Sequence, residues 1–182
     1  GGCAELYDLK PDIVTYGKAL GGGVPMAAIG GSNEIMSGLE WGKVLHFGTH
    51  NAGRLALHIC KTMLTEMLAD EQAGFKKIED LGLKLTKEIQ EVTRKNNKHK
   101  VICQGVNSMF QIFFTDQEKI SDYRDFCRSV DRIKFRDFSL KLFDKGIYMN
   151  PSATLHSLSA VVHNEEDIRV TAKAISETLD EL

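Results

Sequence analysis

Two helical patterns enclose a region of strand-like sequence, and this order constrains the fold more than any other feature of the chain. Apolar residues recur every three or four positions, the spacing of one helix face, at Ile78, Leu81, Leu85, Ile89 and Val92. The same spacing returns in residues 165–182. Between them, residues 101–103 and 108–115 are rich in β-branched and aromatic side chains, which favours strands. The fold class is therefore α/β, with a few mostly antiparallel strands covered by helices.

The first part of the chain has a different character. Residues 12–15 and 26–29 read as short strands, residues 44–45 as a possible third, and a long helical pattern runs from Ala52 until Gly74 interrupts it. These are too few strands to close a sheet. We therefore expect residues 1–73 to be the end of a larger domain, and residues 74–182 to be a small, self-contained α/β domain.

Shorter signals fill the remaining stretches. Ser32 and Asn164 are suited to cap the helices that follow them, because their side chains can accept hydrogen bonds from the first backbone N–H groups. The predicted helices are residues 120–130 and 132–144, and the predicted strands are residues 147–149 and 158–162.

Composition excludes several classes of partner. The 182 residues carry a net charge of −2, without the basic stripe typical of nucleic-acid binding. No apolar run approaches the ~20 residues that a membrane helix needs, and the first residues do not resemble a signal peptide. The four cysteines are too widely spaced for a zinc site. We expect a reduced, cytoplasmic protein with buried thiols, no metal, and no nucleic-acid or membrane partner.

Lys18 is the first candidate for chemistry. It follows the strand predicted at residues 12–15 and precedes the glycine run 21–23. Glycine allows a close approach of backbone to a ligand, and a lysine facing inward among small residues would have a lowered pKa and a nucleophilic amine. The alternative from local sequence alone is a solvated lysine beside a tight turn.

The glycine run does not match the known nucleotide-binding loops. The P-loop pattern requires a hydroxyl residue after the lysine, where Ala19 stands, and the dinucleotide pattern G-x-G-x-x-G is not met. Gly48 and Thr49 precede the long helical pattern, and a threonine hydroxyl with the backbone N–H groups of a helix start can bind phosphate. A simple helix cap is the alternative for this pair.

Two segments resemble a known family. Residues 11–25, which read PDIVTYGKALGGGVP, resemble the cofactor-lysine segment P-D-[ILV]-x-[ST]-x-x-K-x-[ILM]-G-G-G-x-P of the class III aminotransferases. Residues 146–152 read GIYMNPS, and LSA and HNEEDI follow at residues 158–160 and 163–168. This end is similar to that of the glutamate-1-semialdehyde 2,1-aminomutase branch.

The resemblance implies a fold, a cofactor and an assembly. It implies the C-terminal part of a fold type I transferase dependent on pyridoxal 5'-phosphate, in which Lys18 forms a Schiff base with the cofactor. Gly48 and Thr49 would bind the cofactor phosphate of the neighbouring subunit in a homodimer with a shared active site. The other cofactor-binding residues would lie upstream of this sequence, so that this chain would be part of a longer or complemented one.

The activity implied by the resemblance is amino-group transfer on a small amino acid or amine. It takes the form of an aminomutase, which moves the amine between adjacent carbons, or of a transaminase that uses a keto acid. An amino-acid racemase on the same lysine chemistry is an alternative. A truncated or split non-catalytic subunit, lacking the upstream half of the site, is a second alternative.

Overall fold

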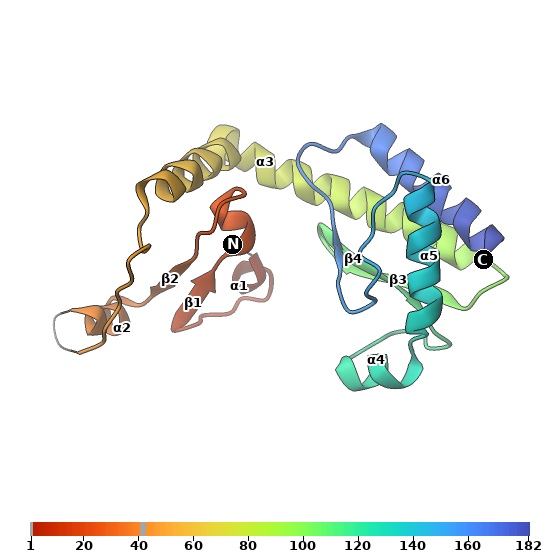
Figure 1. Cartoon of the computed structure of the whole chain (residues 1–182), viewed down its shortest axis with the longest axis horizontal. Coiled ribbons are helices and arrows are strands. Elements are labelled where there is room, and N and C mark those ends of the chain that lie inside the picture. Colours follow the sequence, from red (N-terminus) through yellow and green to blue (C-terminus); the bar gives the residue numbers. More distant parts are fainter. Residues whose placement is uncertain (1, 41–42) are drawn as a thin grey trace. The chain divides into compact units, whose positions relative to one another are not determined.

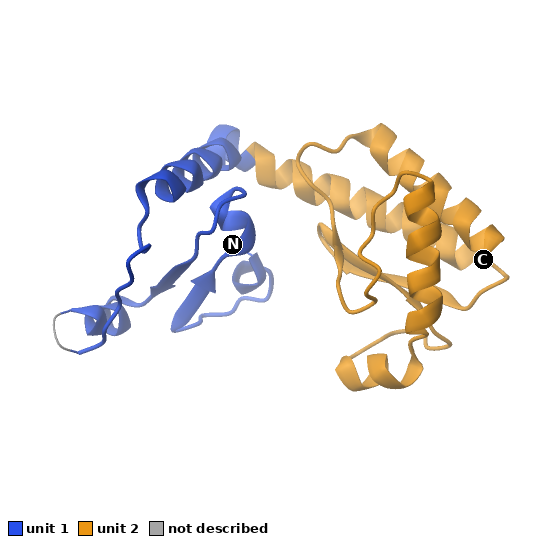
Figure 2. Ribbon diagram, in the orientation of Figure 1, with its two compact units in different colours: residues 1–72 blue, residues 73–182 orange. Residues whose placement is uncertain are grey.

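A computed structural model describes residues 2–40 and 43–182, and the chain divides into two compact units. Unit 1 comprises residues 1–72 and unit 2 comprises residues 73–182 (Figure 2). The predicted first domain begins at Gly1, which lies outside the described residues.

The elements of each unit follow the chain in order (Figure 1). Unit 1 contains α1 (Gly2–Leu6), β1 (Ile13–Tyr16), the 3-10 helix η1 (Lys18–Gly21), β2 (Ala28–Gly31), α2 (Asn33–Met36), the 3-10 helix η2 (Ser37–Leu39) and the first part of α3 (Arg54–Lys95). Unit 2 contains the rest of α3, then β3 (Val101–Val106), β4 (Met109–Phe114), α4 (Tyr123–Ser129), α5 (Arg132–Asp144), β5 (Ser157–Leu158) and α6 (Glu165–Glu181).

Unit 1 is built on a two-stranded antiparallel sheet whose apolar side chains have little cover. β1 and β2 pair from Ile13 opposite Gly31 to Tyr16 opposite Ala28. Ile13 and Tyr16 remain 55% and 52% exposed. The helix cap predicted at Ser32 is confirmed, because its Oγ accepts from Ile35 N at 3.3 Å. The strand predicted at residues 44–45 is wrong, since neither residue joins a ladder in the described part of unit 1.

The long helix α3 is two helical segments joined by a non-helical link at the boundary between the units. Ala69 has an extended conformation, and Asp70, Glu71 and Gln72 all have positive φ angles, of 47°, 57° and 67°. The interruption predicted at Gly74 is thus displaced, and Gly74 itself is helical. The helix is interrupted where the backbone leaves helical φ and ψ angles, at residues 69–72, and a glycine such as Gly74 does not by itself end a helix.

Unit 2 has a three-stranded antiparallel sheet in the order β3-β4-β5, which confirms the prediction of a few, mostly antiparallel strands. Val101 pairs with Phe114 at one end of the first ladder and Val106 pairs with Met109 at the other. One face of the sheet points into the core. Alternate residues of each strand point to this face. On β4 these residues are Phe110, Ile112 and Phe114, all at most 4% exposed.

Helices α3, α5 and α6 contribute to the core that covers this face (Figure 1). Ile89, Phe138 and Ile175, one from each helix, are completely buried. The rings of Phe114 and Phe138 meet edge to face, with their centroids 5.4 Å apart. Each such side chain contributes about 1.5–3 kcal/mol by its removal from water, so this core provides most of the stabilisation of unit 2.

The predicted strands at residues 147–149 and 158–162 need correction. Residues 147–149 form no strand, and only Ser157 and Leu158 pair with β4, opposite Phe110 and Met109. β5 therefore pairs with β4 over two residues only. Met149 is nevertheless buried, so its apolar character reflects packing in the core rather than a ladder.

Gly82 marks the closest approach of α3 to the turn that joins β3 and β4. A methyl group at this position would lie 2.4 Å from the Ser108 Cα and 2.7 Å from the Asn107 carbonyl oxygen. The same region is joined by a hydrogen bond from Ser159 Oγ to the Ile78 carbonyl at 3.3 Å. Only a residue without a side chain lets the helix and the turn pack at this distance.

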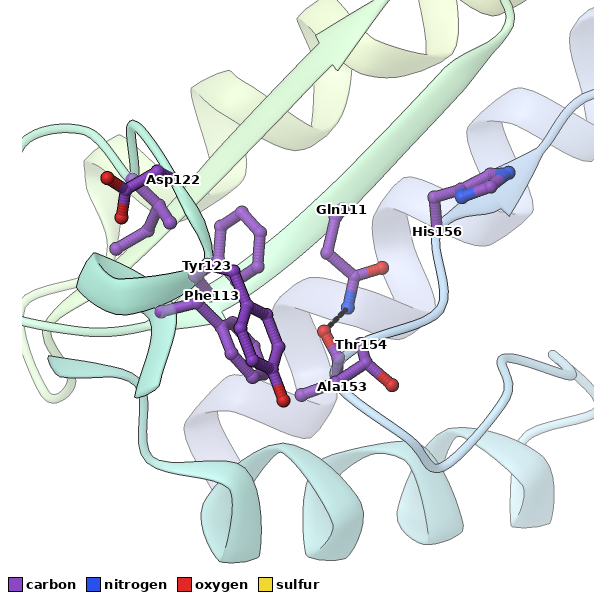
Figure 3. Close-up of a pocket in the computed structure, with 9 residues that line it drawn as sticks. Gln111, Phe113, Asp122, Tyr123, Ala153, Thr154 and His156 are labelled. Atoms are coloured by element: carbon purple, nitrogen blue, oxygen red, sulfur yellow. Dashed lines mark hydrogen bonds between the residues drawn. The ribbon is translucent and has the colours of Figure 1, made fainter. Parts of the chain in front are cut away.

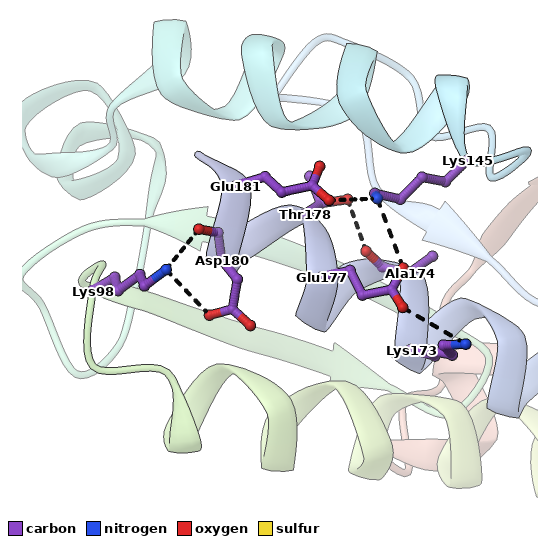
Figure 4. A network of polar contacts seen from close by, with 8 residues as sticks. All are labelled: Lys98, Lys145, Lys173, Ala174, Glu177, Thr178, Asp180 and Glu181. Atoms are coloured by element: carbon purple, nitrogen blue, oxygen red, sulfur yellow. Dashed lines mark hydrogen bonds and ion pairs between the residues drawn. The ribbon is translucent and has the colours of Figure 1, made fainter.

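Helix α6 is fixed at both ends by polar contacts. At its start, Asn164 Oδ1 accepts from Glu166 N and Asp167 N, and Asp167 accepts from Asn164 N, which confirms the predicted cap. Near its end, Lys145 Nζ lies 2.8 Å from Glu181 Oε1 and 3.7 Å from Glu177 Oε2 (Figure 4). Lys145 follows α5, so these ion pairs connect α5 to α6.

The contribution of Lys145 to stability should depend on pH. The hydrogen bond to Glu181 raises the pKa of Lys145 above 10.5, and the same contact lowers the pKa of Glu181 below 4.5. The Glu181 contribution is present above pH 4.5 and is lost as pH falls through the lowered folded pKa. The Lys145 contribution is present below pH 10.5 and is lost as pH rises through the raised folded pKa.

We therefore expect Lys145→Met to lower the midpoint of thermal unfolding at pH 7. The difference from the unchanged protein should shrink below pH 4 and in ~1 M salt, because screening weakens exposed ion pairs. Lys87→Met removes an exposed lysine with no ion pair among the described residues, and should have no such effect. A Lys145→Met difference that stays constant with pH and salt would contradict the electrostatic origin.

Candidate cofactor site

Lys18 lies directly after β1, separated from it only by Gly17. Gly17 has extended dihedral angles, φ −166° and ψ −162°, and Lys18 then begins η1. The φ angle of Lys18 is +53°, in the left-handed region that residues with a side chain rarely adopt. Such conformations cost about 1–3 kcal/mol and cluster at functional sites, where the surrounding structure maintains them.

The Lys18 side chain is exposed, which corrects the expectation that it faces inward. Among the described residues of unit 1, the sheet that ends next to Lys18 has two strands, β1 and β2. No carboxylate lies within ion-pair distance of its amine in the described part of the chain. The amine is therefore accessible to a ligand.

The glycine loop after Lys18 packs against the first part of α3. Gly22 has a φ angle of +58°, and its N–H donates to the Ala19 carbonyl at 3.0 Å. A methyl group on Gly22 would lie 3.2 Å from the Met63 Cβ. A side chain at position 22 would therefore be strained by its dihedral angles and would crowd Met63 of α3.

Gly48 and Thr49 are exposed and belong to a turn that precedes α3. Asn51 N donates to the Gly48 carbonyl at 3.0 Å, and Ala52 has a φ angle of +53°. The helix begins at Arg54, two residues later than predicted, because Ala52 is not helical. Thr49 is therefore not at the helix start itself. No hydrogen bond joins Gly48 or Thr49 to Lys18 among the residues that the structure describes.

A histidine of unit 2 has a structural role. His163 Nδ1 accepts from Ala160 N at 3.1 Å, which gives this histidine a role in the turn before α6. In residues 2–40 and 43–182, no group of three His, Cys, Asp or Glu side chains could hold a metal ion. No helix in these ranges is long and apolar enough to cross a membrane.

The cysteines agree only partly with prediction. All four are free, but only Cys60 and Cys103 are buried, whereas Cys3 and Cys127 are exposed. Burial in apolar surroundings raises the pKa of the Cys103 thiol to about 12, so this group is not a nucleophile.

Comparison with known proteins gives one consistent result. The family model for class III aminotransferases matches residues 2–179. A glutamate-1-semialdehyde 2,1-aminomutase of Thermus thermophilus is 38% identical over 181 residues, covering 98% of this chain. That of Akkermansia muciniphila is 30% identical over 183 residues. The chain spans about two fifths of the length of these relatives, 41% and 42% respectively.

Solved structures show the same fold. A β-phenylalanine aminotransferase from Variovorax paradoxus matches 99% of the chain with a TM-score of 0.88 and 22% identity. An ω-transaminase from Sphaerobacter thermophilus matches with a TM-score of 0.84 and 22% identity. In each case the match covers 41% of the other chain.

The fold is that of the C-terminal part of a fold type I, pyridoxal-phosphate-dependent transferase. Within this class, the chain belongs to the class III aminotransferase family. Proteins of this family depend on pyridoxal 5'-phosphate.

The residues present fit two groups of this cofactor, its aldehyde and its phosphate. An exposed primary amine without an ion-pair partner, held at a strand end by a glycine loop, is suited to bond to an aldehyde carbon. An exposed threonine hydroxyl and the turn at Gly48 are suited to a phosphate. Lys18, Gly48 and Thr49 are thus the groups of this chain that would hold pyridoxal phosphate.

The backbone strain at Lys18 can be measured separately from its amine. Lys18→Gly and Lys18→Ala both remove the amine, but only glycine adopts a φ angle of +53° without steric cost. In the complete protein we expect Lys18→Gly to be more stable to denaturant than Lys18→Ala by about 1 kcal/mol.

A neighbouring alanine provides the control for this comparison. The φ angle of Ala19 is not positive, so glycine has no steric advantage there. Ala19→Gly should therefore lower stability, because glycine loses more conformational freedom on folding. Equal stability of Lys18→Gly and Lys18→Ala would show that the left-handed conformation is not maintained at this position.

Proposed function

We propose that this chain forms the C-terminal part of an enzyme that transfers amino groups with pyridoxal phosphate, and that Lys18 carries the cofactor. The observation behind the proposal is Lys18 itself. It combines a free, exposed amine, a left-handed backbone at a strand end and a glycine loop that packs on α3. It also occupies the lysine position of the family pattern described for residues 11–25.

Lys18 has two roles in the proposed reaction. Its Nζ would be the group of this chain that holds pyridoxal phosphate, at the aldehyde carbon of the cofactor. Once a substrate amine had taken its place, the Lys18 amine would remove the proton from the substrate carbon that carries the amino group and would deliver it to the former aldehyde carbon of the cofactor. When bound, pyridoxal phosphate supplies the electron sink for this proton removal. Gly17 and the loop after Lys18 orient the amine.

The proposed activity is of the aminomutase type, in which the amine moves between adjacent carbons of one small amino acid. This preference comes from the curated relatives, which are glutamate-1-semialdehyde 2,1-aminomutases at 30–38% identity. The transaminases among the solved structures are 22% identical and support the fold alone. An aminomutase would turn over with a single substrate, whereas a transaminase would require an added keto acid.

The proposal extends to domains, assembly and compartment. Residues 1–73 would complete a large cofactor domain, and residues 74–182 would be its small domain. The enzyme would be a homodimer in which Thr49 reaches the cofactor of the neighbouring subunit. The exposed apolar side chains of unit 1, such as Ile13 and Tyr16, are consistent with further protein covering them. The four free cysteines fit a reducing compartment such as the cytoplasm.

The experiment for Lys18 is covalent labelling of the complete protein. Borohydride reduction in the presence of pyridoxal phosphate should leave the pyridoxyl mass on the peptide that contains Lys18. Lys18→Ala should remove the label and lower turnover by at least about a thousandfold, because both the covalent bond and the proton transfer lose their amine. Lys18→Arg should do the same, because a guanidinium stays protonated.

Lys61 provides the matched control. It is an exposed lysine of unit 1 on α3, and Lys61→Ala should retain both the label on Lys18 and turnover. A label found on Lys43 or Lys61, or near-normal turnover of Lys18→Ala, would falsify the proposal.

The phosphate role of Thr49 is tested by Thr49→Val in the complete protein. Loss of a hydroxyl bonded to a charged phosphate should weaken retention of pyridoxal phosphate about ten- to a hundredfold, with the fold unchanged. Cofactor release during dialysis and circular dichroism measure the two effects. Thr62→Val serves as control, because the Thr62 hydroxyl bonds to the His58 carbonyl within α3. Equal retention of pyridoxal phosphate in the two variants would show that Thr49 does not bind its phosphate.

A further inference from the structure

Lys18 keeps a left-handed backbone although the residue is exposed. Its φ angle is +53°, and such a conformation persists only where the surrounding structure maintains it. On the upstream side the sheet holds the chain, because Tyr16 pairs with Ala28 of β2 and only Gly17 separates Tyr16 from Lys18. On the downstream side, a second point of attachment is needed to keep Lys18 in this conformation.

The segment after β1, residues 17–24, is a series of overlapping turns that we call the Lys18 loop. Three backbone N–H groups each donate to the carbonyl oxygen three positions earlier, at 3.2, 3.0 and 3.2 Å. The donors belong to Leu20, Gly22 and Val24. Successive turns share residues, so a displacement at one turn is passed to the next. Whatever fixes Gly22 therefore also restrains Lys18.

The first part of α3 meets the Lys18 loop at Gly22. A methyl group on Gly22 would lie 3.2 Å from Cβ and 3.4 Å from Cγ of Met63, and 3.5 Å from Cγ2 of Ile59. Both side chains belong to a buried or partly buried stripe of α3 at helical spacing, formed with Cys60 and Met67. The backbone of Gly22 thus lies against this stripe, with Met63 as its nearest neighbour.

We propose that Met63 is a positioning residue for Lys18. It holds Gly22 in place, and through the overlapping turns it keeps Lys18 left-handed at the end of β1. The importance of this role for catalysis rests on the proposed function, in which the Lys18 amine holds pyridoxal phosphate and moves a proton. Both tasks require the amine within reach of one atom, and a misplacement of about 1 Å can lower a rate about a hundredfold.

The first measurement concerns the Lys18 loop in the complete protein without pyridoxal phosphate. Met63→Ala removes Cγ and the atoms beyond it, so amide hydrogen exchange of a peptide covering residues 17–24 should become about tenfold faster by mass spectrometry. Met67→Ala is the matched control, because it shortens the same kind of side chain one turn further along the same stripe. It should leave the exchange of the loop unchanged. Equal rates in the two variants would overturn the inference.

The second measurement concerns the amine of Lys18. Pyridoxal phosphate is added to the cofactor-free, complete protein, and borohydride stops the reaction at intervals, so that the pyridoxyl mass on Lys18 gives a rate of attachment. Met63→Ala should slow attachment about tenfold. Met63→Leu fills a similar volume and should restore the rate to within about twofold of the unchanged protein. Met67→Ala should have no effect on it.

The outcomes of the second measurement separate the inference from the proposed function. If Met63 served stability alone, Met63→Ala and Met67→Ala would attach pyridoxal phosphate at the same rate, and the inference would be wrong. If the label in the unchanged protein appeared on a lysine other than Lys18, the proposed function would be wrong. The exchange measurement would then still decide whether Met63 holds the loop, because it needs no cofactor.

Gly22→Ala tests the same contact from the loop if Met63→Ala does not fold. It removes no atom from α3, and its methyl group would crowd Met63 at a strained φ angle of +58°. Loop exchange should become about tenfold faster, and attachment to Lys18 about tenfold slower. Gly38→Ala is the control, since its methyl group would make only an ordinary contact of 3.7 Å, with Val44. Unchanged exchange and attachment in Gly22→Ala, with its fold checked by circular dichroism, would overturn the inference.

Discussion

Strand β4 is the element on which unit 2 depends, because one of its faces forms part of the core and the other points away from it. Phe110, Ile112 and Phe114 point into the core formed with α3, α5 and α6, where removal from water stabilises the fold. Gln111 and Phe113 point to the opposite face, where they line a pocket (Figure 3). A shift of the register by one residue would exchange the two faces, so the same pairing that forms the core also creates the pocket.

Unit 1 obeys a different constraint. Its hairpin is too small to bury its own apolar side chains, and Ile13 and Tyr16 are more than half exposed. The unit nevertheless has a defined local geometry. Gly22 packs against Met63. Lys18, at the end of β1, has a left-handed backbone conformation. Local backbone geometry therefore presents an exposed lysine at the end of β1.

Predictions from sequence succeeded where one short pattern determines one local structure. The helix at residues 132–144, the caps at Ser32 and Asn164 and the strands at residues 101–103 and 108–115 in an antiparallel sheet were all confirmed. The strands at residues 44–45 and 147–149 were wrong. Their apolar residues are equally suited to strands and to irregular packed segments, and a strand exists only where a neighbouring strand offers its hydrogen bonds.

The sequence by itself determined the family, since the lysine, the glycine run and the proline after it stand in a fixed local register. It also determined the helical faces, because their period follows from the geometry of the helix. Only the tertiary structure decided that Lys18 is exposed with a positive φ angle, and that Gln104 is fully bonded while Gln111 is not. The hydrogen bonds of the two glutamines depend on residues distant in sequence, Ile120 and Ala153, whose proximity no local pattern specifies.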